Sequence, residues 1–372
     1  MPNVTCRLLY VVGRLHTGGL ERQLYYLLRS MDRERYKPAV AAWNFSEQDL
    51  YVGRIRELGV PVYSFPNEAS GFEKLGAFRD LVGQLEPEVV HSYSFYTNFS
   101  AHWAARGRRI VAVGSVRSDF LWAKTETGPC LGRLSAYYPR HQIFNSYSAA
   151  QTVSAMRSPF VPRHFFVVRN SIDFEHFHDL PLQTNGPACI LGVGYLLPIK
   201  RWERLLLAAQ ALKLQGLNCL IRIAGDGPLR NDLEDKSRAL GLAPSVTFLG
   251  HIDKIHDLLA EATFLVHTAD SEGCPNAVME AMACGRAVVA TDAGDIPMLV
   301  ENGKSGFVVG HHDKAALVER MATLISDREL CRSMGQLARA KAEREFGLGR
   351  LVEETLAVYR SAGWREASTD SV

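Results

Sequence analysis

The stretch Asp270-Ser-Glu-Gly-Cys-Pro-Asn-Ala-Val-Met-Glu-Ala-Met-Ala-Cys-Gly285 governs how the rest of the chain is interpreted. It follows the apolar run Ala262–His267, which is typical of a buried strand. Pro275 suits the first position of a helix and Gly285 the position just past its end, so we predict a short helix over Pro275–Cys284. The free amides at the start of such a helix attract phosphate, which makes the preceding loop a predicted anion site.

Two carboxylates, Glu272 and Glu280, flank this predicted anion site, and neither has an adjacent basic partner in the sequence. Glu280 shares one helix face with Asn276, four residues earlier. Taken singly, Glu272 is explained as a complement to the helix dipole and Glu280 as a solvated helix residue. Their combination around Gly-Cys-Pro-Asn favours a functional site.

The spacing Glu272-x7-Glu280 resembles the E-x7-E signature of the family 4 retaining glycosyltransferases, which have the GT-B fold. The resemblance implies that Glu280 holds the ribose hydroxyls of a nucleotide-sugar donor. It also implies that the loop holds the sugar and the diphosphate, through Glu272, Gly273, Cys274 and Asn276.

The composition agrees with a cytoplasmic enzyme of two domains. The chain has 372 residues and a formal net charge of +2, which argues against nucleic acid as a main partner. Its 7 cysteines lack metal-like spacing and are typical of reduced thiols. We find no signal-peptide pattern and no apolar run that could span a bilayer. No metal and no cofactor are expected, because the nucleotide-sugar is a substrate and no His, Asp or Cys cluster has ligand spacing.

Strands and helices alternate through the first half of the chain, which indicates a parallel sheet covered on both faces. The apolar run Arg7–Leu15 leads through Gly18 and Gly19 into a helical pattern. Such a glycine pair can serve only to pack helix against strand, but the family resemblance implies that it faces the donor phosphates. Further predicted strands are Lys37–Trp43, Pro61–Phe65, Val89–Tyr93, Ile110–Val116, Gln142–Asn145 and Phe165–Arg169.

Three polar residues follow strands of this first half. His91 and Tyr93 stand where the family often has His-x-His, and the resemblance leaves open which of them lies nearest the sugar. The alternative for His91 is a core histidine. Arg117 follows the next strand and could meet a phosphate or an acidic acceptor, or could pair with Asp119.

A second alternating set begins at Cys189–Tyr195, and its first helix is predicted to start near Lys200 and Arg201. Two cations at a helix start oppose the helix dipole, so we predict an anion there. The family implies that Lys200 grips the diphosphate and acts in catalysis with Glu272 and His91. Tyr195 replaces a family arginine, and Arg201 could compensate for it.

Five more strands are predicted after the first strand of this set: Leu220–Ala224, the run from Val246, the run Ala262–His267, Ala287–Thr291 and Ser305–Val309, which ends the sheet. By resemblance, His251 and Ile252 bind the base largely through backbone. Asp295 and Met298 replace a family Gly and Glu, which we expect to reshape the sugar end of the pocket.

The expected architecture is α/β, with two Rossmann-like doubly wound domains facing each other across a cleft and a C-terminal helix returning to the first domain. The domains are predicted as an acceptor-side domain over 1–170, a linker over 171–187, a nucleotide-sugar domain over 188–346, and a crossover helix and tail over 347–372.

The function implied by the resemblance is transfer of a sugar, with UDP-sugar the favoured donor, to a hydroxyl in glycan, polysaccharide or glycolipid synthesis. The acceptor stays open between glycan, lipid-linked and small-molecule classes. Alternatives are a GT-B epimerase, a natural-product glycosyltransferase and an inactive glycan-binding homologue. Aromatic and basic residues around Phe95–Arg109, Phe120–Lys124 and Tyr137–His141 suggest peripheral contact with the cytoplasmic membrane face, although Phe95, Phe99 and Trp103 also fit one buried helix face.

Overall fold

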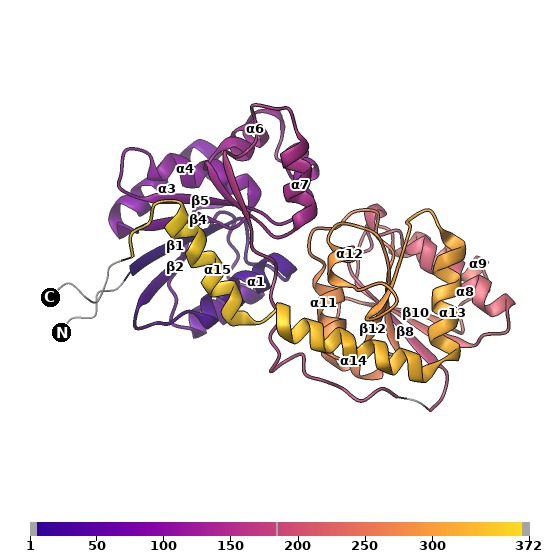
Figure 1. Cartoon of the computed structure of the whole chain (residues 1–372). Coiled ribbons are helices and arrows are strands. Elements are labelled where there is room, and N and C mark those ends of the chain that lie inside the picture. Colours follow the sequence, from indigo (N-terminus) through magenta and orange to yellow (C-terminus); the bar gives the residue numbers. More distant parts are fainter. Residues whose placement is uncertain (1–5, 184, 367–372) are drawn as a thin grey trace. The chain divides into compact units, whose positions relative to one another are not determined.

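The computed structural model describes residues 6–183 and 185–366, and the chain divides into two compact units. Unit 1 comprises Met1–Ser171 and Leu348–Val372, and unit 2 comprises Ile172–Gly347. Each unit is built on one parallel sheet with helices on both faces (Figure 1). The segment predicted as a linker, 171–187, therefore falls into unit 2 after its first residue, and the predicted tail from 367 lies outside the described residues.

The sheet of unit 1 has seven strands in the order β3-β2-β1-β4-β5-β6-β7. All seven predicted strands of this half are present. They are β1 (Cys6–Val12), β2 (Tyr36–Ala42), β3 (Val62–Ser64), β4 (Val89–Ser92), β5 (Val111–Val116), β6 (His141–Phe144) and β7 (His164–Val167).

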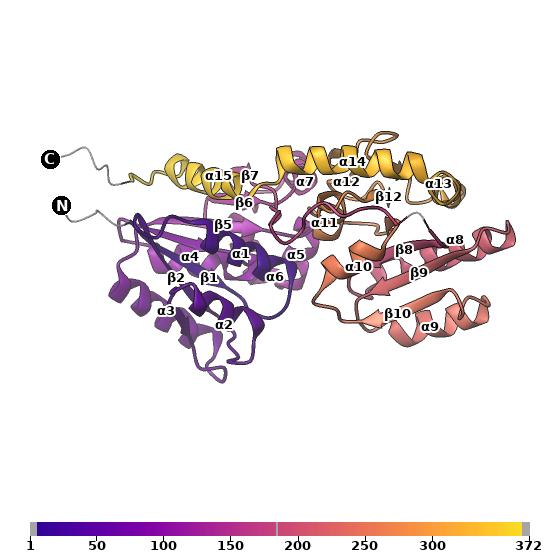
Figure 2. The same cartoon turned by 90° about the horizontal axis from the view of Figure 1, so that it is seen from below.

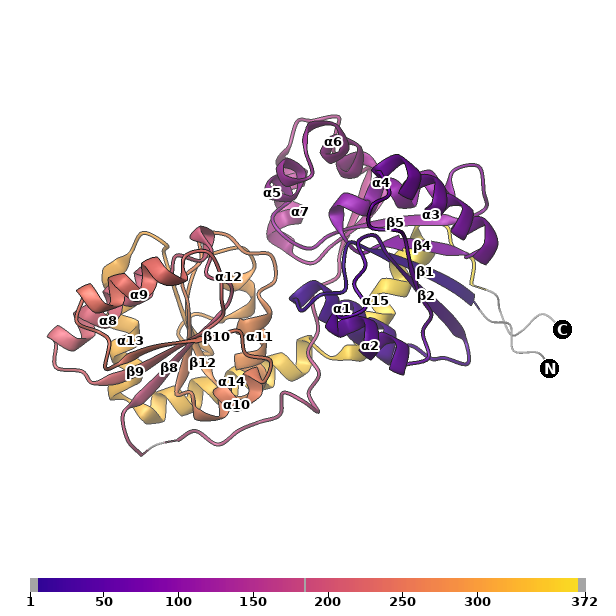
Figure 3. The same ribbon diagram turned by 180° about the vertical axis from the view of Figure 1, so that it is seen from behind.

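Side chains of β1 alternate between the two faces of this sheet, as the period of a strand requires. Leu8, Tyr10 and Val12 pack against α1 (Gly19–Ser30), α2 (Leu50–Glu57) and α15 (Leu348–Ser361). Leu9 and Val11 pack against residues of α3 (Gly71–Leu85) and α4 (Asn98–Ala105). These two helices lie on the other face of the sheet (Figure 3). Because β1 is buried on both faces, its sequence is almost continuously apolar.

The region beyond β4 contains short helices that the sequence pattern does not predict. They are η1 (Phe95–Thr97), α5 (Phe120–Glu126) and α6 (Pro129–Tyr137), and α7 (Tyr147–Ala155) follows them after β6. Phe95 is buried here, Phe99 is half-buried and Trp103 is 37% exposed. A single buried helix face through these three rings is therefore wrong for Trp103.

The sheet of unit 2 has six strands in the order β10-β9-β8-β11-β12-β13. In both sheets the chain winds outward in one direction and then in the other, so that β1 and β4, and likewise β8 and β11, flank the point of reversal. Ligands of doubly wound sheets bind at the carboxyl ends of these strands. The strands are β8 (Ala188–Val193), β9 (Cys219–Ala224), β10 (Val246–Gly250), β11 (Phe264–His267), β12 (Ala287–Thr291) and β13 (Gly306–Val309).

Helices cover both faces of this second sheet. One apolar cluster joins Leu265 to α10, α11 and α14, and another joins Phe264 and Val266 to α8, α9 and α13. The long helix α14 lies along the unit (Figure 2). The helical segments are η2 (Pro198–Lys200), α8 (Trp202–Leu214), α9 (Arg230–Ala239), α10 (Ile255–Glu261), α11 (Asn276–Ala283), α12 (Ile296–Leu299), α13 (Lys314–Ser326) and α14 (Arg328–Glu345).

The last helix, α15, returns to unit 1 and packs beside α1, which confirms the predicted return (Figure 1). Its Tyr359 is fully buried and contacts Tyr10 of β1 and His91 of β4. None of the helices in the described part of the chain is both long and apolar enough to cross a membrane.

Candidate functional site

Lys200, His267 and Glu272 meet at the point of strand reversal in unit 2. Lys200 ends the turn after β8, His267 is the last residue of β11, and Glu272 lies in the loop that follows β11. One carboxylate oxygen, Glu272 Oε1, accepts hydrogen bonds from Lys200 Nζ and from His267 Nε2, the latter at 2.8 Å. The side chains are 19%, 13% and 3% exposed for Lys200, Glu272 and His267. They form a largely buried charged cluster with one edge open to solvent.

The pKa of Glu272 reflects this arrangement. Burial alone would raise it, but the charge of Lys200 and the hydrogen bond from His267 outweigh burial and lower the pKa of Glu272 to about 2. Glu272 is therefore a carboxylate throughout the neutral range. The absence of a basic neighbour in the sequence is thus misleading, because Lys200 comes from a segment 72 residues away.

The loop after β11 is fastened to the turn that carries Lys200. Thr268 Oγ1 donates to the carbonyl of Lys200 at 2.9 Å, and the amide of Asp270 donates to Ile199 at the same distance. The Asp270 carboxylate in turn pairs with Arg201 and Arg204. These contacts fix the backbone on both sides of the Lys200–Glu272 pair.

Lys200 and Arg201 stand at the start of α8, as predicted. Lys200 ends a 3-10 turn, Arg201 is a left-handed N-cap (φ +54°), and α8 begins at Trp202. In the structure each cation has a protein carboxylate beside it, Glu272 for Lys200 and Asp270 for Arg201, and the donor anion stays a prediction. Since Arg201 is held by Asp270, its compensation for Tyr195 stays a prediction.

Glycines allow the neighbouring loops to approach this cluster. Gly294 has φ +57°, and a Cβ there would collide with the carbonyl of Glu272 and lie 3.0 Å from that of Gly273. The next amide, of Asp295, donates to Gly273 at 3.1 Å. The loop after β12 is therefore pressed directly against the loop that carries Glu272.

Helix α11 begins at Asn276, with Pro275 as its N-cap, one residue later than predicted. Gly285 adopts φ +68° just past its end, as expected. Glu280 is only 2% exposed, so its interpretation as a solvated helix residue is wrong. Cys274 is buried and donates to Met279 Sδ, so its side chain faces the core.

The remaining unit 2 residues lie at the same sheet edge. Tyr195 follows β8, is 54% exposed, and accepts a hydrogen bond on its carbonyl from Trp202 Nε1 at 2.9 Å. His251 and Ile252 follow β10, where His251 is exposed and contacts Asp253 at 3.1 Å and Ile252 is half-buried. Within the described residues, no group of His, Cys, Asp and Glu is arranged to hold a metal ion.

In unit 1, His91 is 1% exposed and both its ring nitrogens are engaged. Nδ1 lies 2.7 Å from Tyr359 Oη and Nε2 lies 2.8 Å from Ser115 Oγ. Burial, assisted by the charge of Arg117, holds the pKa of His91 well below its usual range, so the ring is neutral. These are the contacts of a core histidine, and the catalytic role of His91 stays a prediction.

Tyr93 and Arg117 pack on each other beside His91. Tyr93 is fully buried, and the Arg117 guanidinium lies 3.7 Å from the centre of its ring. Asp119, the predicted alternative partner of Arg117, caps α5 through the amide of Trp122 at 2.8 Å. Burial also raises the pKa of Tyr93.

The glycine pair of unit 1 lies at the start of α1, with Gly18 as the extended N-cap and Gly19 as the first helical residue. A Cβ at Gly18 would collide with the carboxylate of Glu21, which therefore lies over this loop. Burial raises the pKa of Glu21 to about 7. A hydrogen bond to its own backbone opposes this rise, and the charge of Asp49 adds to it.

His267, Asp270 and Glu21 are site residues that sequence reasoning missed. His267 offered a signal, because it is a polar residue that ends an apolar strand five residues before Glu272. Glu21 stands two residues after the glycine pair, but nothing in the local sequence indicates its burial. The partners of Asp270 lie in a different segment of the chain.

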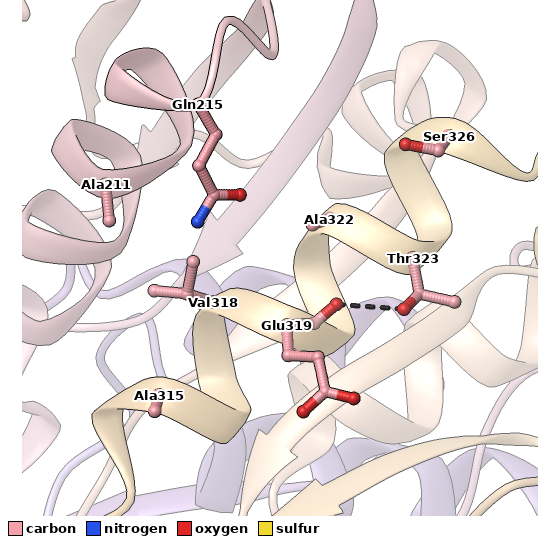
Figure 4. A pocket seen from close by; sticks show the side chains of 8 residues that line it. All are labelled: Ala211, Gln215, Ala315, Val318, Glu319, Ala322, Thr323 and Ser326. Carbon is pink, nitrogen blue, oxygen red and sulfur yellow. Dashed lines mark hydrogen bonds between the residues drawn. The ribbon is translucent and has the colours of Figure 1, made fainter.

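A groove of about 590 Å³ lies elsewhere on unit 2, between α8 and α13 (Figure 4). Its walls are mostly small or apolar, and Glu319 is its single charged residue. It is formed by covering helices and not by the carboxyl ends of strands, so we separate it from the charged cluster. The residues lining it are Ala211, Gln215, Ala315, Val318, Glu319, Ala322, Thr323 and Ser326.

Two family models match the chain. The model described as "Glycosyl transferases group 1" matches residues 174–341, and the "Glycosyl transferase 4-like domain" matches residues 18–170. Together they cover the charged cluster of unit 2 and the glycine loop and buried histidine of unit 1.

Relatives and solved structures agree with these models. The alpha-maltose-1-phosphate synthase of Mycolicibacterium smegmatis is 26% identical over 77% of this chain and 82% of that protein. A putative colanic acid biosynthesis glycosyltransferase, WcaL of Salmonella typhimurium, is 33% identical, but the match spans only 50% of this chain and 48% of WcaL. The structure of Anabaena HepE with UDP-glucose has a TM-score of 0.80 at 20% identity, covering 95% of this chain and 99% of that one.

Proposed function

This chain belongs to the group 1 glycosyltransferases, and on that basis we propose that it moves a sugar from a nucleoside diphosphate donor to an acceptor hydroxyl with retention of anomeric configuration. The observation that carries the proposal is the Lys200–Glu272–His267 cluster at the carboxyl ends of β8 and β11. This is the edge where a doubly wound sheet binds its ligand.

The donor diphosphate is assigned to Lys200 and to the start of α11. Lys200 carries a full positive charge, and the first amides of a helix have no partners within it. Asn276 and Ala277 at that start are half-buried, whereas the rest of α11 is buried. Negative charge on the diphosphate grows as the sugar leaves, so both groups act most strongly in the transition state.

The ribose and the sugar are assigned to the two glutamates. Glu280 is buried one helical turn beyond Asn276, which suits a carboxylate that accepts hydrogen bonds from ribose hydroxyls. Glu272 is ionised and is fixed by Lys200 and His267, with a second oxygen left to accept from a sugar hydroxyl. Charged acceptors of this kind orient a substrate more strongly than neutral ones.

The reaction breaks the bond between the anomeric carbon and the diphosphate oxygen. The acceptor oxygen forms a bond to the same face of that carbon, and its proton passes to the departing diphosphate. In this scheme the chain supplies charge and orientation, and the diphosphate serves as the base.

We assign UDP-sugar as the donor class and a growing glycan or polysaccharide as the acceptor class. HepE, which shares the fold, was solved with UDP-glucose, and WcaL is described as a colanic acid biosynthesis enzyme. The retained Lys200–Glu272 pair favours an active transferase over an inactive homologue.

Unit 1 is proposed to work at the cytoplasmic face of a membrane. Trp122 is 59% exposed and Leu121 is 48% exposed on α5, while Lys124 and Arg133 lie close enough that the charge of Arg133 helps burial lower the pKa of Lys124. Exposed apolar side chains beside cations suit an anionic interface. Flotation with anionic and neutral vesicles at low and high salt tests this, and protein that stays unbound to anionic vesicles at low salt contradicts it.

The experiment that tests the function screens nucleotide-sugars by thermal shift and then identifies transfer products by mass spectrometry. Lys200→Ala should lower turnover more than donor affinity, because its charge matters most as the diphosphate leaves. Lys314→Ala, at the exposed start of α13, is the matched control. Wild-type turnover in Lys200→Ala would place the diphosphate elsewhere.

A further inference from the structure

The charged cluster contains more hydrogen-bond donors than its carboxylate needs in the donor-free protein. Lys200 Nζ and His267 Nε2 converge on the same oxygen of Glu272. One cation suffices to neutralise one carboxylate, so Lys200 and Glu272 balance each other without a charge on His267. The histidine side chain is 3% exposed, and Glu272 is the one carboxylate that contacts its Nε2 among the described residues.

Donor binding changes this balance, on the basis of the proposed function. The diphosphate brings two negative charges to the single positive charge of Lys200, which already pairs with Glu272. The other cations on the same side, Arg201 and Arg204, are both engaged by Asp270. In a partly buried site, an uncompensated carboxylate is strongly unfavourable.

The groups that face this cluster leave His267 as the one that can gain a charge. The segment from η2 to α8 contributes Lys200, Arg201 and Arg204, and the loop after β11 contributes Asp270 and Glu272. From β12 comes the uncharged Thr291, which donates to the carbonyl of His267 at 3.5 Å and to that of Ala269 at 2.6 Å. The loop after β12 adds the buried Asp295. Helix α11, which packs against β11, adds the buried Glu280. Guanidinium and ammonium groups keep their charge in the neutral range and the partners of Glu272 hold it ionised, whereas an imidazole changes its charge there.

We infer that His267 takes up a proton when the donor diphosphate binds, so that the imidazolium becomes the partner of Glu272 and Lys200 turns its charge to the diphosphate. His267 is thus a positioning residue, which acts on the donor through Glu272 and Lys200. Binding that consumes a proton strengthens as the pH falls, because the two equilibria are linked.

Calorimetry of the full chain with a UDP-sugar counts this proton directly. The probe is UDP-glucose, or the UDP-sugar that gives the largest thermal shift, because a diphosphate diester has no proton of its own to exchange near neutral pH. Titration in two buffers of different ionisation enthalpy gives the number of protons taken up per donor bound. The proteins compared are wild type, His267→Gln, Glu272→Gln and the control His312→Gln, which alters an exposed histidine at the start of α13.

Wild type and His312→Gln should take up close to one more proton per donor than His267→Gln. Glutamine at 267 keeps a hydrogen-bond donor for Glu272 but cannot accept the proton. Donor affinity of wild type should rise by up to about tenfold for each unit that the pH falls, whereas that of His267→Gln should stay flat. Glu272→Gln should lose the uptake with the histidine intact, so the test holds even if His267→Gln folds poorly.

Equal proton uptake in wild type and His267→Gln would overturn the inference, as would a wild-type donor affinity independent of pH. Either result with active wild-type enzyme leaves the proposed function standing. Failure of every nucleotide-sugar to bind or react would instead overturn the proposed function and this inference with it.

Discussion

Two glutamates of this protein have pKa values shifted in opposite directions, and the difference is set by their partners. Both are substantially withdrawn from water. Glu272 has a lysine and a histidine against one oxygen, and its pKa falls to about 2. Glu21 lies over the glycine loop of unit 1, where burial raises its pKa to about 7 and the negative charge of Asp49 adds to the rise. One carboxyl is therefore always ionised at neutral pH, and the other titrates there.

Replacing Glu21 by Gln should stabilise the protein at alkaline but not at acidic pH. The folded pKa of about 7 exceeds the unfolded value, so the folded state holds a proton that the unfolded state loses between about pH 4.5 and 7. Stability from this group is full below that window and is lost as the pH rises through it. Thermal melts should show Glu21→Gln gaining roughly a few degrees over wild type from pH 5 to pH 8. Glu68→Gln, at an exposed site, is the control, and a pH-independent difference would contradict the assignment.

Replacing Glu280 by Gln should weaken donor binding while leaving the fold intact. The change removes charge from hydrogen bonds to the ribose, which are worth roughly 1.5–3 kcal/mol. Calorimetry with the UDP-sugar that binds wild type measures the loss, and circular dichroism checks the fold. Unchanged nucleotide affinity would remove Glu280 from the donor site.

Sequence reasoning found Glu272, Glu280 and Lys200 but not the contacts between them. Residue type and local spacing identify a carboxylate beside a helix start. The pairing of Lys200 with Glu272 depends on β8 and β11 lying side by side, and their segments are far apart in the chain. For His91 the pattern indicated a strand end, but only the tertiary packing of Tyr359 and Ser115 reveals that both its nitrogens are engaged.

At the scale of elements, the strands were the most predictable part of the molecule. All thirteen described strands coincide with runs identified from the sequence. The signal is strongest for central strands such as β1 and β12, which are buried on both faces and therefore almost continuously apolar. The short helices α5 and α6 carry no comparable signal, since Leu121, Trp122 and Leu131 are exposed apolar residues that blur the helical period. The helix start predicted near Lys200 and Arg201 is present, but a 3-10 turn that begins at Pro198 precedes it.

The loop glycine Gly294 should be essential for the geometry of Glu272. Alanine there would place its Cβ against the carbonyls of Glu272 and Gly273 in addition to straining a left-handed backbone. Gly303→Ala is the matched control, because Gly303 has φ +79° but open space around it.

Both alanine variants should lose about 1 kcal/mol or more of stability from the backbone conformation. Only Gly294→Ala should also lose most of its transfer activity at temperatures where it remains folded. Denaturant unfolding and the mass-spectrometric transfer assay measure the two effects. Equal activity in the two variants would show that the collision is relieved without moving Glu272.

At the scale of the whole molecule, the C-terminal helix α15 covers one face of the sheet that begins with β1. Tyr359 Oη donates a hydrogen bond to Tyr10 Oη at 3.2 Å. In a continuous series of hydrogen bonds through the neutral imidazole, Tyr359 Oη accepts from His91 Nδ1 at 2.7 Å. Ser115 then donates to His91 Nε2. The resemblance to the family predicted that this helix returns, but it did not indicate which side chains hold it.

Tyr359→Phe should destabilise the protein by roughly 1–3 kcal/mol, because it removes the hydrogen-bond partner of the buried His91 Nδ1 and the hydroxyl that donates to Tyr10. Denaturant unfolding measures the change. Tyr63→Phe, in the half-buried strand β3, is the control, since its hydroxyl has no hydrogen bond among the described residues. A loss no larger than that of the control would show that the buried chain of hydroxyls contributes little.

The return of α15 also fixes the order in which the protein can mature on the ribosome. Every strand of unit 1 is synthesised before residue 171, yet the helix that covers Tyr10 and His91 is translated after the whole of unit 2. Nascent chains emerge from the N-terminus onward, so unit 2 can fold while the first sheet still lacks one of its covers. A premature stop codon or a frameshift shortly before α15 would therefore leave unit 2, with its E-x7-E motif, intact. Unit 1 would lack the helix that covers Tyr10 and His91, so apolar surface of its sheet would stay exposed.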